Sequence, residues 1–256
     1  MPSQNELPTN SDSFGSLATV EVLDLDTLGV KESFEWSDNE SVGQVNGLTV
    51  SQDGAYLAAL LEGYGPRYLE VLKRSRRRVI YSSLNIITDS AMLWTPDNKL
   101  VFVMSMEAQG DPERWGAIGA VPLERFLASS GANLEIDLYA TFTRAEWDAG
   151  IGDIAFSKDG VQLAFTRGQD VWVMDFAQGA TAHKLTTGPI HVGGTQFSPD
   201  GASLALSTRS QYGLNETYVI PNHRNAPILI DHGQGAGNAY LTGEDTLIDA
   251  MLAWLP

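Results

Sequence analysis

The stretch FSPDGASLAL at 197–206 is one of four similar segments in this chain. In each copy a short apolar or aromatic run leads to Ser or Thr, then to an Asp-Gly or Asp-Asn turn, and then to a second apolar run. Glycine accepts positive φ freely and aspartate bonds its own following backbone, so each copy predicts a strand, a turn and a strand. Asn98 stands where the other copies have glycine, and asparagine is the next best residue for a left-handed turn position. The other copies are VSQDGAYLAA at 50–59, WTPDNKLVFV at 94–103 and FSKDGVQLAF at 156–165.

The spacing of these copies indicates a larger repeating unit. Their turn aspartates follow one another at intervals of about 40 to 60 residues, which is the length of a propeller blade with four short strands. Two further strands are expected after each pair, for example 170–176, which alternates apolar and polar residues, and 182–186, an outer edge strand. The sequence therefore predicts an all-β fold, a β-propeller of four-stranded antiparallel blades.

The two ends of the chain extend this pattern. Residues 19–26 and 29–34 resemble the third and fourth strands of a blade, and 249–256 resembles a first strand, with Asp, Trp and Pro at the same offsets as in 89–96. About five blades are visible. Either the last blade is shared by both termini, which closes the ring and removes exposed sheet edges, or the chain is truncated from a larger propeller. We expect residues 1–16 to be a disordered polar leader and 17–256 to be a single domain.

Longer connections interrupt one blade. An insertion at 107–114 precedes a third strand, and 122–133 lengthens the next connection, where we expect a helical turn. Insertions on one rim of a repeat protein are candidate binding loops.

The pattern of an aromatic or apolar residue, Ser or Thr, Pro, Asp and Gly, as in Phe197-Ser198-Pro199-Asp200-Gly201, resembles the WD40-like repeat of TolB-type β-propellers. It is also similar to the propeller domains of prolyl oligopeptidase-like proteases. The resemblance covers about 18–256 and implies a non-catalytic, exported bacterial module that binds a protein, a peptide or a small polar ligand. This chain departs from TolB in lacking a recognisable N-terminal α/β domain, which puts a role in that envelope complex in doubt.

The amino-acid composition limits the classes of partner that this chain is expected to bind. Thirty-two acidic and sixteen basic residues give a formal charge of −16, which repels phosphate backbones and anionic lipids, so we expect no nucleic acid and no direct membrane insertion. The absence of cysteine excludes disulfides and thiolate chemistry but leaves the compartment open. The TolB resemblance implies a periplasmic or extracellular location, and a cytoplasmic location stays open. We expect a monomer.

Polar residues recur near the start of the predicted inner strands, where blades deliver side chains to the channel mouth. Convergent acids there could bind a cation or a basic peptide end. The competing interpretation is that such residues satisfy backbone donors in the connecting loops. The candidate binding residues are Asn46, Asp89, Asp153, His191 and Asp249.

The sequence lacks the patterns that mark common catalytic sites. The chain has no G-x-S-x-G nucleophile elbow, and its four histidines lack metal-ligand spacing. We therefore expect no enzyme activity, no cofactor and no metal. Two alternatives are kept: a substrate-gating propeller of a serine hydrolase whose catalytic domain is missing, and a carbohydrate-binding propeller using Trp36, Trp115 or Trp147. The basic run 73–78 is expected at a hairpin tip, with an acidic protein partner as its functional interpretation.

Overall fold

The computed structural model describes residues 18–23, 27, 29–36, 44–62, 68–76, 78–83, 92–106, 114–129, 134–186, 191–209, 215–221 and 228–232. The leader predicted at 1–16 and the first strand predicted at 249–256 lie outside these ranges.

Four sheets each contain four antiparallel strands that are consecutive in the chain. We number them as blades, from the inner to the outer strand. Blade 1 holds β3 (Gln44–Val50), β4 (Tyr56–Glu62), β5 (Tyr68–Lys73) and β6 (Arg78–Ser83). Blade 2 holds β7 (Met92–Trp94), β8 (Lys99–Ser105), β9 (Gly116–Pro122) and β10 (Asp137–Phe142). Blade 3 holds β11 (Ile151–Phe156), β12 (Gln162–Arg167), β13 (Asp170–Asp175) and β14 (His183–Lys184), and blade 4 holds β15 (His191–Phe197), β16 (Ser203–Arg209), β17 (Asn215–Pro221) and β18 (Ile228–His232).

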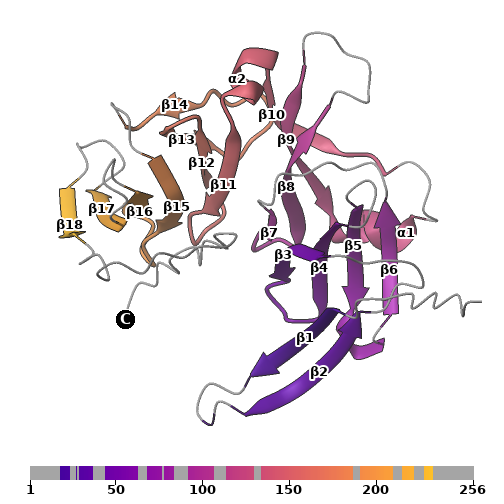
Figure 1. The fold of residues 1–256 in the computed structure, drawn as a ribbon. Coiled ribbons are helices and arrows are strands. Elements are labelled where there is room, and N and C mark those ends of the chain that lie inside the picture. Colours follow the sequence, from indigo (N-terminus) through magenta and orange to yellow (C-terminus); the bar gives the residue numbers. More distant parts are fainter. Residues whose placement is uncertain are drawn as a thin grey trace, which may run out of the picture.

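The four sheets are arranged around a common centre. The inner strands contact one another in chain order: β3 contacts β7, β7 contacts β11, and β11 contacts β15. Figure 1 shows these four strands toward the middle, with β6, β14 and β18 toward the outside. This radial order of small antiparallel sheets confirms the predicted β-propeller.

The first two strands among the described residues form a separate pair. β1 (Ala18–Leu23) and β2 (Val30–Trp36) pair antiparallel in a two-stranded sheet, which lies below blade 1 in Figure 1. They occupy the places predicted for a third and a fourth strand. The predicted inner strand of this fifth blade falls outside the described residues.

The predicted turns are present in all four blades. Gly54, Gly160 and Gly201 have φ of 68°, 72° and 71°, and Asn98 has φ of 57°. Each of these residues donates its backbone N–H to the carbonyl of the Ser or Thr three residues earlier. The prediction that Asn98 replaces glycine in a left-handed position is therefore confirmed.

The core lies between the blades. Trp94 and Phe102 of blade 2 pack with Ala58 and Val71 of blade 1, and the other face of blade 2 packs against Phe165 of blade 3. A third cluster joins blade 3 to Phe197, Leu204 and Leu206 of blade 4. Because alternate residues of a strand face opposite sides, one apolar strand can fill two of these layers.

In the described part of the chain, three short helical segments connect strands. The 3-10 helix η1 (Arg74–Arg76) forms the predicted tip between β5 and β6. The helix α1 (Leu123–Ala128) confirms the helical turn expected within 122–133 and buries Phe126. The helix α2 (Arg144–Asp148) was not predicted. No helix in the described ranges is long and apolar enough to cross a membrane.

One predicted strand is shorter than expected. The edge strand predicted at 182–186 is reduced to His183–Lys184, which pair with Val173 and Trp172. Leu185 and Thr186 leave the ladder there, although they still bond to Val171: Leu185 donates its N–H to the Val171 carbonyl, and the Thr186 hydroxyl accepts from the Val171 N–H at 3.0 Å.

Candidate functional site

The antiparallel topology gives the propeller two distinct faces. Each inner strand starts at one face and ends at the other, where its Asp-Gly or Asp-Asn turn follows. We call the face that carries these four turns the turn face. The turn that follows Asp175, between the third and fourth strands of blade 3, also lies on this face. The starts of β3, β11 and β15 lie on the opposite face. Residues predicted for the channel mouth and residues of the turns therefore cannot form one site.

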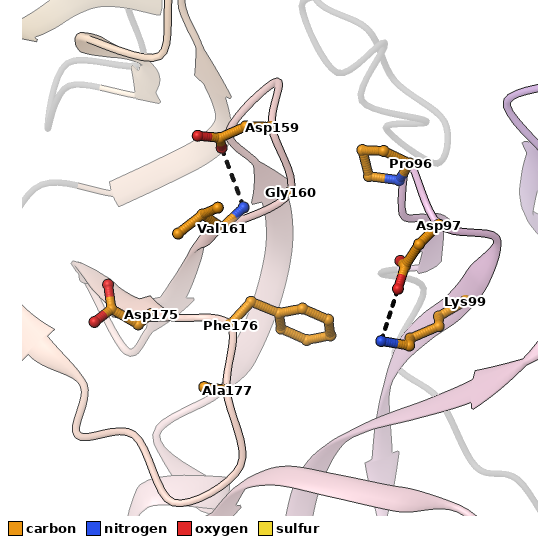
Figure 2. Close-up of a pocket in the computed structure, with 9 residues that line it drawn as sticks. All are labelled: Pro96, Asp97, Lys99, Asp159, Gly160, Val161, Asp175, Phe176 and Ala177. Atoms are coloured by element: carbon orange, nitrogen blue, oxygen red, sulfur yellow. Dashed lines mark hydrogen bonds and ion pairs between the residues drawn. The ribbon is translucent and has the colours of Figure 1, made fainter.

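A pocket of about 450 Å³ opens on the turn face between blades 2 and 3. Figure 2 shows one wall from blade 2 and the other from the first and third turns of blade 3, with the ring of Phe176 directed toward the gap. The volume falls within the range of small-ligand sites. The lining residues are Pro96, Asp97, Lys99, Asp159, Gly160, Val161, Asp175, Phe176 and Ala177.

The walls approach each other closely at one point. A Cβ placed on Gly160 would lie 2.9 Å from Cδ of Pro96. Glycine is therefore required at position 160 for two reasons: its φ is positive, and the neighbouring blade lies too close for a Cβ. This approach sets the spacing of the two walls.

Hydrogen bonds favour the charged form of two pocket carboxylates, Asp159 and Asp97. The hydroxyl of Ser157 donates to Oδ1 of Asp159 at 2.6 Å, and the N–H of Val161 donates to the same oxygen at 3.1 Å. These two bonds hold the pKa of Asp159 below its ordinary value. Burial opposes ionisation of Asp97, but hydrogen bonds from Lys99 and Thr95 outweigh it, so the pKa of Asp97 is lowered as well.

The lysine of the pocket is already engaged. Nζ of Lys99 lies 2.7 Å from Oδ2 of Asp97, and this bond raises the pKa of Lys99. The lining thus places three carboxylates against one ammonium group. Asp159 and Asp175 are exposed to solvent on the blade 3 wall, and in Figure 2 their carboxylates point away from Lys99.

Aromatic packing supports the floor. Phe176 stacks on Tyr139 of β10 with ring centres 3.9 Å apart and meets Phe156 edge-on at 4.7 Å. The Phe176 N–H also donates to the Val161 carbonyl at 2.7 Å, which ties the two turns of blade 3 together. Val161 itself is 55% exposed. The pocket therefore combines an anchored apolar floor with an acidic rim.

The predicted channel-mouth residues are only partly described. Asn46 and Asp153 both lie at irregularities of the inner ladder, between Val45 and Gly47 in blade 1 and between Gly152 and Ile154 in blade 3. Asp153 has φ of 37°, a left-handed conformation that aspartate tolerates better than most residues. This backbone requirement supports the structural interpretation of Asp153, and a binding role for Asn46 and Asp153 stays a prediction.

The other three predicted residues, His191, Asp89 and Asp249, are not found at such a ladder irregularity within the described residues. His191 is the first residue of β15, but the ladder irregularity of blade 4 falls two residues later, between Val192 and Gly194. Asp89 and Asp249 lie outside the described residues. Their convergence at a channel mouth stays a prediction.

Tryptophan and arginine side chains cluster around α2. Arg144 lies over the ring of Trp115 at 4.3 Å, and Arg167 lies over Trp172 at 3.4 Å while pairing with Glu146 at 2.5 Å. The ring of Trp147 occupies the space where a Cβ of Gly116 would be, 1.9 Å from its Cε3. Trp115 and Trp147 are thus packing residues that anchor α2 to β9. The side chain of Trp36 lies outside the described part.

The basic run has a partner within the chain. Arg74 in η1 donates from Nε and Nη2 to the two carboxylate oxygens of Glu32, at 3.0 and 2.8 Å. This bidentate pair links the β1–β2 hairpin to blade 1. Arg74 therefore has a structural role in addition to any role in recognition.

Sequence reasoning assigned the turn aspartates to folding and missed the pocket. The turn motif recurs in every blade as Ser or Thr, any residue, Asp and then Gly or Asn, so it could not show which pair of turns would enclose a space. Among the described residues no group of three His, Asp or Glu side chains could hold a metal ion.

Comparisons with known proteins concern the fold alone. No protein-family model and no curated protein matches the chain. The β-propeller domain of Myceliophteria thermophila Cps50 (Swd1) is 16% identical, with a TM-score of 0.53, and the match covers 80% of this chain and 59% of that one. Kuenenia stuttgartiensis hydrazine synthase is 15% identical, with a TM-score of 0.53, and the match covers 79% of this chain and 64% of that one. A TolB protein from Agrobacterium tumefaciens is 19% identical, with a TM-score of 0.57, and the match covers 86% of this chain and 72% of that one.

The chain spans less than two thirds of the length of the first two of these structures. The three structures are a β-propeller domain, a TolB protein and the enzyme hydrazine synthase, and the likeness to them concerns the fold. With the radial sheets and the Asp-Gly turns described above, the likeness establishes the fold: this chain is a β-propeller of four-stranded antiparallel blades.

Proposed function

We propose that this propeller is a non-catalytic binding module that holds a basic segment of a partner protein in the pocket between blades 2 and 3. The observation that carries the proposal is the pocket lining, in which the carboxylates of Asp159 and Asp175 come from the same blade 3 wall as the apolar side chains of Val161 and Phe176.

A lysine or arginine side chain fits this combination of groups. Its aliphatic stem would lie against Val161 and Phe176, while its charged head would reach the carboxylates. Hydrogen bonds between ionised partners are about twice as strong as neutral ones. The formal charge of −16 would also accelerate encounter with a cationic partner.

The cellular setting belongs to the same proposal. The resemblance to TolB-type propellers and the likeness to the Agrobacterium tumefaciens protein support a module of the bacterial envelope, periplasmic or extracellular, that acts through protein contacts. We propose a monomer with one protein or peptide partner.

Binding of short fluorescent peptides tests the proposal. The probes are a peptide of alternating arginine and leucine and its counterpart with glutamate in place of arginine, titrated with the protein and followed by anisotropy. We expect the arginine peptide alone to bind, with an affinity that falls as salt rises because part of the attraction is screened.

Two variants locate the site. Asp159→Asn combined with Asp175→Asn should weaken binding of the arginine peptide by about tenfold, which corresponds to about 1.4 kcal/mol. Asp148→Asn in α2 combined with Glu21→Gln in β1 is the matched control, because it also removes two exposed carboxylates, from other parts of the molecule. If the control weakens binding as much as the double variant, the attraction is a general effect of net charge and the pocket assignment is wrong.

A further inference from the structure

The first turn of blade 2 is one residue shorter than the first turns of the other three blades. In blades 1, 3 and 4 the second strand starts three residues after the turn aspartate, at Tyr56, Gln162 and Ser203. In blade 2 it starts two residues after Asp97, at Lys99. Both of these residues line the pocket, so the blade 2 wall contains the turn that departs from the common pattern.

The shorter turn changes what the aspartate binds. In the other three turns the backbone N–H two residues after the aspartate donates to its Oδ1, at 2.9 Å in blade 1, 3.1 Å in blade 3 and 3.0 Å in blade 4. The corresponding N–H in blade 2 belongs to Lys99 and donates instead to the hydroxyl of Thr95, at 2.9 Å. The carboxylate of Asp97 is held by the Lys99 ammonium, 2.7 Å from Oδ2, and by the Thr95 hydroxyl.

A side-chain partner can be exchanged, whereas a backbone partner is fixed by the turn itself. The side chains of Lys99 and Asp97 are 30% and 60% exposed, and water weakens an ion pair of this exposure. Lysine carries its charge on a flexible four-carbon stem, while the Thr95 hydroxyl closes the turn without help from that charge. The bond between Lys99 and Asp97 can therefore open while the turn stays folded.

We propose that Lys99 acts in this pocket as an internal competitor, which holds Asp97 until a second basic side chain of the partner replaces it. This role of Lys99 rests on the proposed function, because it needs a basic partner. Asp97 lies on the blade 2 wall, whereas Asp159 and Asp175 lie on the blade 3 wall with their carboxylates pointing away from Lys99 (Figure 2). The partner is therefore a segment with at least two basic residues, one for each wall.

Removing the competitor should strengthen binding. Lys99→Met removes the ammonium but keeps an apolar stem, and it should bind the arginine peptide about two- to fivefold more tightly, a range set by the strength of an exposed ion pair. Lys184→Met is the matched control, because Nζ of Lys184 also lies 2.7 Å from a carboxylate, that of Asp170, and its loss changes the net charge equally. The control should bind like the parent protein. Thermal unfolding checks that both variants are folded.

A double-mutant cycle separates competition from simple repulsion. If Lys99 competes for Asp97, the gain from Lys99→Met should fall by at least about half in an Asp97→Asn background, because no carboxylate is left to be freed. An equal or larger gain in that background would overturn the proposal, since Lys99 would then act by repelling the peptide.

The same titrations separate this proposal from the proposed function. If the parent protein binds the arginine peptide and Lys99→Met binds it no more tightly, the competitor role is wrong and the binding site stands. If neither protein binds the peptide, the proposed function fails and the competitor role fails with it.

Discussion

Replacing the turn serine of blade 3, Ser157→Ala, probes the element that repeats in every blade. Ser157 is 5% exposed and its hydroxyl accepts from the N–H of Gln162 at 2.9 Å while donating to Asp159. Alanine leaves the Gln162 N–H without this acceptor at the start of β12. An unsatisfied donor of this kind costs about 1–3 kcal/mol of the free energy of unfolding.

Thermal unfolding followed by circular dichroism measures this cost. In a chain of this length 1 kcal/mol lowers the melting temperature by about 2–4 °C, so we expect Ser157→Ala to melt about 2–12 °C below the parent protein. Ser157→Thr should restore most of the loss, because Thr95 makes the same bonds in blade 2: its hydroxyl accepts from the Lys99 N–H at 2.9 Å and donates to Asp97 at 2.5 Å.

The exposed Thr181→Ala provides a surface control, with an expected change within about 0.5 kcal/mol. If Ser157→Ala melts with the control, or if threonine fails to rescue it, the turn hydroxyl does not stabilise the blade as argued.

Three further predictions concern other parts of the molecule. The hydrogen bonds that lower the pKa of Asp53 and Asp159 below 3.8 stabilise the fold above about pH 4, and this stabilisation is lost as pH falls through the lowered pKa values of the folded state. The double variant Asp53→Asn with Asp159→Asn should therefore lose less stability between about pH 5 and pH 2 than the parent protein. An unchanged slope of stability against pH would contradict this. Gly116→Ala should lower the free energy of unfolding by about 1–3 kcal/mol, because its Cβ would overlap the ring of Trp147. In a Trp147→Ala background this loss should largely disappear, which a double-mutant cycle followed by denaturant unfolding measures. Arg74→Met should lower the free energy of unfolding by at most about 1 kcal/mol, since the ion pair with Glu32 is partly exposed. In high salt the variant and the parent protein should be equally stable. A stability difference that persists in high salt would assign Arg74 a packing role.

Local chemistry explains why the blade pattern could be predicted. The Asp-Gly turn acts within a few residues: Ser198 donates to Asp200 at 2.5 Å, and Asp200 accepts from the N–H of Ala202 at 3.0 Å. A motif that satisfies its own backbone is visible in the sequence wherever it occurs. The departure at Asn98 could be predicted for the same reason.

The features that sequence reasoning missed depend on contacts between distant segments. The pocket exists because Gly160 meets Pro96 of the neighbouring blade, and nothing local to either turn specifies that approach. The helix α2 had a local signal, since Thr143 and Glu146 form a capping box, but its position is fixed by the packing of Trp147 on Gly116. The length of β14 depended on how far residues 182–186 could follow β13.

Hydrogen exchange of the protein with and without the arginine-leucine peptide tests the central claim, that the pocket between blades 2 and 3 is the binding site. We expect added protection at 96–99, 159–161 and 175–177, with the opposite face near Asn46, Asp153 and α2 unchanged. Protection concentrated on that opposite face, or none in these three turns at saturating peptide, would contradict the account.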